Sequence, residues 1–348
     1  MHFETPHALQ AYWDLAAASV QADALDLALE LGIFEALTQP CDLADLTTQL
    51  DLHASNTANF LDLLWSMGLL QRCETKAQGK HVMSYQSRPE ALHYLSKDSP
   101  DYCGDAWLYR LRALRHFGTQ LREHVKHGKS GSASAFASAI GKNWAAAAKA
   151  QIGQEQRAVT VAAALAIIHR IPEFKDARNC LDLGGGPGWV AIALAQANPA
   201  LRASVFDWPE TALVAQDNIE QAGLSGRVQA QGGDLAVDDI GEAYDFIWCS
   251  SVLHFVPDVN ACLQKIYAAL RPGGVLVCAH AEIAPNAQTA ARVLPYYLPM
   301  MMQGKHVGKQ GGLATELRQV GFCSIGGFEA CDFPMAPVQV LIAKKAVS

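Results

Sequence analysis

The sequence predicts an α/β fold in which a doubly wound parallel sheet follows a mainly helical N-terminal region. Short apolar strands alternate with helical patterns between residues 179 and 279, and such alternation is typical of a parallel sheet with helices on both faces. The first of these strands breaks into the glycine run Cys180-Leu-Asp-Leu-Gly-Gly-Gly-Pro-Gly-Trp189 before a helical pattern resumes. Open α/β sheets bind ligands at such turns, because backbone amides meet there at the carboxyl edge of the sheet.

The N-terminal region predicts helices followed by a small hairpin. Apolar residues recur at helical spacing over residues 8–38, and two shorter helical patterns cover 42–50 and 55–67. Strand-like segments follow at 68–72 and 81–85. Helix, turn, helix and hairpin in this order form the layout of a winged helix.

A winged helix that reads DNA needs a basic second helix. Here no Lys or Arg lies between Ser55 and Leu70, and Asp62 lies on the helix. Packing or dimerisation is therefore favoured over DNA binding for this region.

A helical linker is predicted between the two regions. A helix over 107–125 precedes the polar, small-residue stretch 126–134, and an alanine-rich helix over 145–171 follows. Pro172 helps to end this helix, because proline removes a backbone donor and clashes with the preceding turn. We place the boundary with the sheet domain at Pro172.

The sheet domain reads as strands and helices in alternation. The predicted strands are 179–183, 203–206, 228–231, 245–250 and 275–279, and the predicted helices are 190–198, 211–222 and 259–270. The turn Arg271-Pro-Gly-Gly274 leads from helix to strand. A last helix over 313–320 precedes an antiparallel pair near Phe328 and 338–343.

Composition limits the classes of partner. The chain has 348 residues, half of them apolar, and a net charge of −7 that argues against a nucleic-acid partner. No apolar run reaches the roughly 18 residues that a bilayer requires, and no signal peptide is recognisable, so we expect a cytoplasmic protein without a membrane partner. Nine cysteines without a Cys-x-x-Cys pair fit reduced thiols.

The glycine spacing indicates which cofactor is bound. A dinucleotide fingerprint requires a glycine where Trp189 stands. The pattern Asp182-x-Gly184-x-Gly186-x-Gly188, with Asp207 ending the next strand about 20 residues on, instead resembles motif I of the class I S-adenosylmethionine (SAM) methyltransferases. The alternative for the glycine run is a tight turn without a ligand.

Specific contacts to SAM follow from this interpretation. Amides of Gly184, Gly185 and Gly186 are expected to bind the carboxylate, Asp182 to favour the ammonium and Asp207 to accept the ribose hydroxyls.

Three further positions complete the expected cofactor site. Asp234 and Leu235 would lie near the adenine and Trp208 along the adenosine, while Asp234 taken alone fits a helix N-cap or a turn equally well. Ser250 stands where related enzymes often carry a cofactor-contacting lysine.

A narrower resemblance rests on four motifs behind the winged-helix-like start. They are Phe206-Asp-Trp-Pro209, Gly233-Asp-Leu235, residues 244–258 and Leu270-Arg-Pro-Gly-Gly274. In this order they resemble the small-molecule O-methyltransferases, such as the caffeate, isoflavone, acetylserotonin and phenazine enzymes. The resemblance implies a dimerisation domain at 1–100, a linker at 101–172 that contributes to the acceptor pocket, and a Rossmann-like SAM-binding domain at 173–348. It also implies a homodimer and a small-molecule acceptor.

The same resemblance makes His254 the general base. The chemistry agrees, because a phenol with a pKa near 10 is a poor nucleophile at neutral pH and an imidazole with a pKa near 6.5 can accept its proton. The methyl transfer is an in-line displacement, to which positioning contributes much of the rate. A base of this kind predicts a limb in the pH–rate profile near pH 6–7, whereas a structural histidine predicts none.

The surroundings of His254 depart from the family pattern. Phe255 and Val256 replace the usual aspartate and tryptophan. Glu282 could match one of the glutamates that flank the base, and His306 is the nearest polar candidate for the other. Either the base is oriented differently, or the acceptor is already acidic, as a thiol or an activated phenol is.

The acceptor pocket is expected to include Met300, Met301 and Phe255, because thioethers adapt to flat apolar rings. Packing in the core is the alternative for the two methionines. Cys249, His254, His280 and His306 could be read as a metal cluster, but their spacing matches no common signature, so we expect no metal.

Together these patterns predict a homodimeric SAM-dependent O-methyltransferase. Methylation at sulfur, nitrogen or carbon is one alternative, and SAM binding without transfer is another. A winged-helix regulator with a metabolite-binding domain is a third, disfavoured by Asp62 and the lack of basic residues on the second helix.

Overall fold

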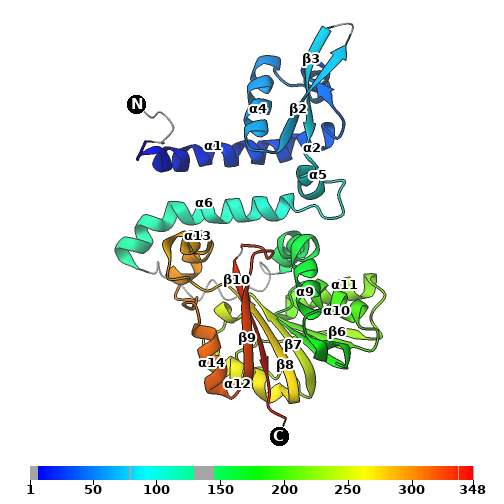
Figure 1. Cartoon of the computed structure of the whole chain (residues 1–348), viewed down its shortest axis with the longest axis vertical. Coiled ribbons are helices and arrows are strands. Elements are labelled where there is room, and N and C mark those ends of the chain that lie inside the picture. Colours follow the sequence, from blue (N-terminus) through cyan, green and yellow to red (C-terminus); the bar gives the residue numbers. More distant parts are fainter. Residues whose placement is uncertain (1–6, 78–79, 129–144, 336, 348) are drawn as a thin grey trace. The chain divides into compact units, whose positions relative to one another are not determined.

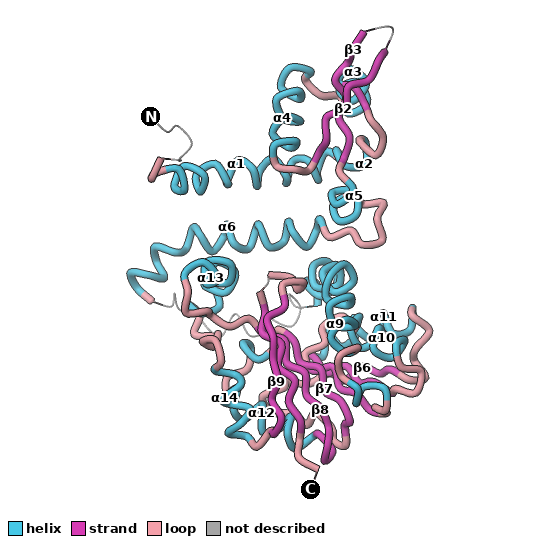
Figure 2. The backbone as a smooth tube through the Cα atoms, viewed as in Figure 1, coloured by secondary structure: helices cyan, strands magenta, loops and turns pink. Residues whose placement is uncertain are grey.

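A computed structural model describes residues 7–77, 80–128, 145–335 and 337–347. The chain divides into two compact units, Met1–Leu111 and Arg112–Ser348, which are drawn in Figures 1 and 2.

The first unit follows the predicted order of helix, turn, helix and hairpin. Its elements are α1 (Gln10–Leu31), α2 (Ile33–Ala36), β1 (Cys41–Asp42), α3 (Leu43–Leu50), α4 (Ala54–Ser66), β2 (Leu70–Ala77), β3 (Lys80–Ser87) and α5 (Pro89–Leu95). The strands form a small antiparallel sheet in the order β1-β3-β2. Helix α6 (Gly104–His127) begins in this unit and extends into the second.

Helix α4 is tied to the hairpin through Asp62. The carboxylate of Asp62 accepts a hydrogen bond from the Tyr85 hydroxyl at 2.5 Å and pairs with Arg72. The Arg72 guanidinium lies 3.8 Å from the ring centroid of Trp65. The bond from Tyr85 and the charge of Arg72 lower the pKa of Asp62. The acidic group on α4 therefore serves the packing of this unit.

The second unit is built on a seven-stranded sheet in the order β6-β5-β4-β7-β8-β10-β9. Its strands are β4 (Asn179–Leu183), β5 (Arg202–Asp207), β6 (Val228–Gly232), β7 (Tyr244–Ser250), β8 (Leu270–His280), β9 (Cys323–Ala330) and β10 (Val338–Lys344). The first five are parallel, and β10 pairs antiparallel with both β8 and β9. The predicted parallel sheet and terminal antiparallel pair are thus confirmed.

Helices cover both faces of this sheet (Figure 1). The regular helices are α8 (Gly153–Glu155), α9 (Val161–Ile168), α10 (Trp189–Ala197), α11 (Pro209–Gln221), α12 (Val259–Ala269), α13 (Ala287–Met302) and α14 (Gly312–Val320). The shorter helical segments are η1 (Ala148–Ile152), η2 (Gln156–Thr160), η3 (Pro172–Lys175) and η4 (Leu253–Phe255). Among the described helices, none combines the length and apolar character needed to cross a bilayer.

One predicted helix needs correction, and one helix of the structure was not predicted. The helix expected over 145–171 is interrupted by the π-helical turns η1 and η2, and its last α-helical residue is Ile168. Helix α13 was not predicted, because Pro295 and Pro299 lie inside it and proline normally argues against a helix interior.

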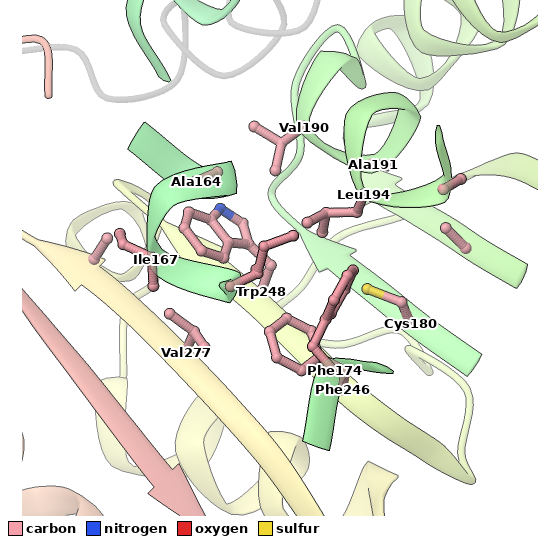
Figure 3. Close-up of a cluster of buried hydrophobic side chains, with 14 of the residues drawn as sticks. Ala164, Ile167, Phe174, Cys180, Val190, Ala191, Leu194, Phe246, Trp248 and Val277 are labelled. Atoms are coloured by element: carbon pink, nitrogen blue, oxygen red, sulfur yellow. The ribbon is translucent and has the colours of Figure 1, made fainter. Parts of the chain in front are cut away.

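The period of two along the buried strands divides the core into two clusters. Phe246 and Trp248 face α9 and α10, whereas Ile247 and Cys249 face α12 and α14. Figure 3 shows Trp248 between side chains of both α9 and α10, with Phe174 against Phe246. The last two rings meet edge to face with their centroids 5.3 Å apart. This packed core fixes the strand ends from which the site is built.

Candidate active site

The site lies where the strand order reverses, between β4 and β7. The chain leaves β4 toward β5 and β6 and then returns to the other side of β4 as β7. Ligands of open α/β sheets bind at such a switch point, outside the carboxyl ends of the strands. The amide of Gly184 donates to the Phe206 carbonyl at 2.8 Å, and that of Gly233 donates to the Asp207 carbonyl at 2.9 Å. The ends of β4, β5 and β6 are thereby joined.

Gly184 cannot carry a side chain in this structure. Its φ of +67° lies in the left-handed region, and a Cβ there would come within 2.4 Å of Cγ2 of Val252. Val252 belongs to the turn after β7 that also carries His254. Glycine therefore allows the loop after β4 and the turn after β7 to pack closely together.

The loop amides have partners other than those predicted. The Gly186 amide donates to Oδ2 of Asp207 at 2.8 Å, and the Gly188 amide donates to the Gly185 carbonyl at 3.0 Å. The Trp189 amide donates to Oε1 of Gln156 at 3.1 Å. The amides of Gly184, Gly186 and Gly188 thus donate to protein oxygens in this structure, and the expected binding of a carboxylate by amides of this loop stays a prediction.

Gln156 was missed by the sequence reasoning. Besides accepting from Trp189, its Nε2 donates to the Gly185 carbonyl at 3.0 Å, and the residue is buried in the π-helical turn η2. Helical turns of this type often occur at functional sites. Only the break in the regular helix distinguishes Gln156, and that break is invisible in an alanine-rich sequence.

Asp182 lies beneath the glycine loop with an exposure of 2%. Its Oδ2 accepts the amide of Ala191 at 3.1 Å, in the first turn of α10. Burial, together with the charge of Asp207, raises its pKa to about 7, although the bond from Ala191 opposes the shift. Its contact with an ammonium stays a prediction.

Asp207 ends β5 as predicted, and its two oxygens accept the amides of Gly186 and Trp208 at 2.8 and 2.7 Å. Burial raises its pKa to about 6 despite these bonds. Asp182 and Asp207 are thus neighbouring enclosed carboxyls, and no basic side chain among the described residues lowers the pKa of either. A ligand that brings an ammonium and hydroxyl donors fits this arrangement.

The other cofactor candidates lie at or just after the carboxyl ends of β5, β6 and β7. Asp234 accepts the Ala236 amide at 2.8 Å as a turn residue, and the Leu235 carbonyl accepts from Lys265 at 2.9 Å. Trp208 is 39% exposed at the start of α11. Ser250 accepts a hydrogen bond from the Trp248 indole at 3.1 Å. Contacts of these residues with a cofactor remain predictions.

His254 lies in η4, directly after the switch-point strand β7, and is 8% exposed. Its ring meets those of Tyr297 and His280 edge to face, with centroids 5.5 and 6.4 Å apart. Burial and the charge of Lys305 lower its pKa to about 4. His254 is therefore neutral at pH 7, and the limb expected near pH 6–7 moves to lower pH.

The two proposed helpers lie elsewhere. Both carboxylate oxygens of Glu282 accept amides at the start of α14, from Gly311 at 2.9 Å and Leu313 at 3.0 Å. His306 is exposed. Nε2 of His306 and Oε1 of Glu282 both lie near Gly308. Among the described residues no carboxylate contacts the His254 ring, so assistance by Glu282 or His306 stays a prediction without a supporting contact.

The acceptor candidates gather around Tyr297. Met300 and Met301 are half-buried against a small cluster that contains Tyr297. The ring centroid of Phe255 lies 4.2 Å from that of His254. His254 is therefore in contact with aromatic groups on more than one element.

Two of the residues named in the metal alternative, Cys249 and His280, have other contacts in this structure. Cys249 is fully buried opposite Cys278 on β8, and Nε2 of His280 accepts backbone amides. In the described ranges no group of three or more His, Cys, Asp or Glu is placed to hold a metal ion.

Comparisons with known proteins agree with this architecture. Residues 114–320 match the model of the O-methyltransferase domain, and residues 13–97 match that of the O-methyltransferase dimerisation domain.

Individual relatives share the whole layout. The chain is 29% identical over 286 residues to the N,N-dimethyltransferase OxyT of Streptomyces rimosus, covering 80% of each protein. It is 28% identical to the tetracenomycin polyketide synthesis 8-O-methyl transferase TcmO of Streptomyces glaucescens, over 88% of this chain and 87% of that protein. The crystal structure of human N-acetylserotonin methyltransferase with SAM has the same fold, with a TM-score of 0.77 at 20% identity over 99% of this chain and 100% of that one.

Proposed function

Because the chain belongs to the O-methyltransferase family, we propose that it transfers the methyl group of SAM to a hydroxyl of a small, mostly apolar aromatic molecule. The position of His254 carries the proposal. This neutral, enclosed imidazole follows β7 at the switch point, on a turn that packs against the glycine loop after β4.

The cofactor would lie over the glycine loop. Asp207 would accept the ribose hydroxyls, and the ammonium would offset the charge of Asp182, whose pKa burial raises to about 7. When bound, SAM supplies an electrophilic methyl group on a sulfonium.

The surroundings of His254 favour an acidic acceptor. Burial and Lys305 hold its pKa near 4, so it is ready to accept a proton at pH 7 but is a weak base. Nζ of Lys305 donates to the Phe255 carbonyl at 3.2 Å, next to the base. An acceptor hydroxyl that loses its proton easily would need little help from His254. The positive charge of the Lys305 ammonium would favour the anionic form of that acceptor. An activated phenol meets both conditions.

The first unit would form the dimer interface. Helix α1 exposes a series of large apolar side chains, among them Tyr12 at 70%, Trp13 at 53% and Val20 at 58%. Exposed apolar surface of this size usually marks an interaction site. The match to the dimerisation domain supports a second copy of this chain as the partner.

The test is release of S-adenosylhomocysteine by the purified protein with a panel of phenols of graded acidity, thiols, amines and carboxylates. We expect turnover with the more acidic phenols, and a loss in His254→Ala that is small for the most acidic phenol and grows toward about 10²–10⁴-fold as the pKa of the phenol rises. His169→Ala, which changes an exposed histidine after α9, is the matched control. Turnover of the least acidic phenol that survives His254→Ala would remove His254 from the role of base.

The panel also separates the alternatives. OxyT is named as an N,N-dimethyltransferase, and another relative, 32% identical over 47% of this chain, as an L-tyrosine C(3)-methyltransferase. Turnover with amines or at ring carbon alone would assign this chain to those reactions. Binding of SAM without turnover of any acceptor would indicate a non-catalytic role.

A further inference from the structure

The turn that carries His254 has an irregular backbone whose amides need acceptors. Ser251 has a φ of +54°, an uncommon value for a residue with a side chain, and η4 spans only Leu253–Phe255. Within the turn, the Phe255 amide donates to the Val252 carbonyl at 2.9 Å. The amides of residues 251–253 precede this bond and are not satisfied by the turn itself.

The end of strand β8 supplies these acceptors. The Ala279 carbonyl accepts the Ser251 amide at 3.0 Å. The next residue, His280, accepts two amides with a single ring nitrogen: Nε2 lies 3.2 Å from the Val252 nitrogen and 3.1 Å from that of Leu253. Two consecutive residues of β8 thus hold three consecutive amides of the turn.

These bonds determine the state of the His280 ring. A nitrogen that accepts must carry its lone pair, so the proton of the neutral ring is on Nδ1. Nδ1 is buried without a hydrogen-bond partner among the described residues, and the residue is 5% exposed. Burial and the neighbouring His254 lower the pKa of His280 to about 3, so its acceptor remains available throughout the neutral range.

A buried polar group without a partner costs about 1–3 kcal/mol, so a position of this kind calls for an explanation. We propose that His280 is a positioning residue whose Nε2 holds the amides of Val252 and Leu253 and thereby fixes the direction of the His254 ring. This inference rests on the proposed role of His254 as the base.

Two replacements of His280 test whether the hydrogen-bond acceptor at Nε2 matters more than the rest of the ring. The side-chain oxygen of His280→Gln falls near the position of Nε2, whereas that of His280→Asn falls near Nδ1. We expect His280→Gln to keep kcat within about fivefold and His280→Asn and His280→Leu to lower it about 10- to 100-fold, the cost of misplacing a catalytic group by about 1 Å. The KM for SAM should change less than about threefold in all three, and His169→Leu serves as the control.

A double-mutant cycle tests whether His280 acts through His254. In the His254→Ala background, His280→Asn should lower the residual rate less than about twofold, because the group it positions is gone. Equal losses in both backgrounds would overturn the proposal and leave His280 a structural role. The proposal would also be overturned if the kcat of a correctly folded His280→Gln variant were as low as that of His280→Leu.

A measurement that needs no turnover separates the test of positioning by His280 from the test of the proposed methyl transfer. Ring ¹⁵N and ¹³C spectra of histidine-labelled protein should show the His254 signals unchanged in His280→Gln and shifted or broadened in His280→Asn. If the native enzyme releases no S-adenosylhomocysteine, the proposed function fails while these spectra still decide the positioning. Unchanged His254 signals in His280→Asn would overturn it.

Discussion

At the scale of single residues, the site depends on groups whose ionisation is set by their enclosure. Among the described residues, the titratable groups that contact or act on His254 are His280, Tyr297 and Lys305. Burial and the lysine both disfavour the imidazolium, and no acid in the described part of the chain opposes them. His254 is therefore in its neutral form over the whole neutral range, the form that its proposed role as base requires.

This leads to a prediction for the pH–rate profile. The neutral ring is the active form, so kcat should rise with pH through a limb near pH 4 and be flat above pH 6. Lys305→Met removes a cation that lowers the pKa of His254, so the limb should move to higher pH. Steady-state rates at saturating acceptor measure this, with Lys309→Met as the control. A limb at pH 6–7 in the native enzyme would contradict the enclosure of His254.

A second prediction concerns Asp182. Its pKa is raised to about 7 in the folded protein, so the folded state binds its proton more tightly than the unfolded state does. The resulting stability is present below pH 4 and is lost as the pH rises through 7. Between pH 4.5 and 8 the free energy of unfolding of the native protein should therefore fall by of the order of 3 kcal/mol relative to that of Asp182→Asn.

Chemical denaturation across that pH range measures this difference. Asp62→Asn is a useful comparison, because the pKa of Asp62 is lowered and its contribution is lost only as the pH falls through the acidic range. The difference in unfolding free energy between Asp62→Asn and the native protein should stay constant from pH 5 to 8. A constant difference for Asp182→Asn as well would mean that the carboxyl is ionised in the folded state.

At the scale of elements, the loop after β4 and the turn after β7 behave as one unit. Gly184 and Gly223 have nearly the same φ, +67° and +68°, but only a Cβ at Gly184 would meet another side chain, at 2.4 Å. Both alanine variants should lose about 1 kcal/mol to the left-handed backbone. Because Val252 must move, Gly184→Ala should lose either a further ~2 kcal/mol of unfolding free energy or more than tenfold of its affinity for SAM. Thermal unfolding and calorimetric titration of the Gly184→Ala and Gly223→Ala variants measure these losses. Equal losses in the two variants would contradict the contact with Val252.

The elements also show how far the sequence could predict the site. Asp207 could be placed from its strand end, because the order of a doubly wound sheet brings such ends to one edge, whereas His254 was placed by the resemblance to the small-molecule O-methyltransferases. Glu282 could not be assigned in this way, since its partners, the amides of Gly311 and Leu313, lie in another segment. Helix α13 was hidden by its two prolines. Gln156 was missed because its contacts depend on how η2 meets the glycine loop.

At the scale of the whole molecule, the exposed apolar face of α1 should control assembly. Val20→Glu, alone or with Trp13→Glu, places charge on that face and should raise the dimer dissociation constant by about 100-fold or more. Val237→Glu is the matched control, because Val237 is 76% exposed in the other unit. Sedimentation velocity over a range of concentrations distinguishes monomer from dimer. A monomeric native protein, or an unaffected dimer in both α1 variants, would exclude this face.

The position of β10 has a consequence for synthesis on the ribosome. β10 follows every other strand of the sheet in the sequence, yet it lies between β8 and β9. While it is still in the exit tunnel, β8 has an open edge of unpaired backbone groups, a form that promotes aggregation of nascent chains. β8 also ends in the two residues that hold the His254 turn. The backbone that holds the His254 turn is therefore completed only after β10 has been made, and a chain that stalls before residue 338 would expose this edge to chaperones.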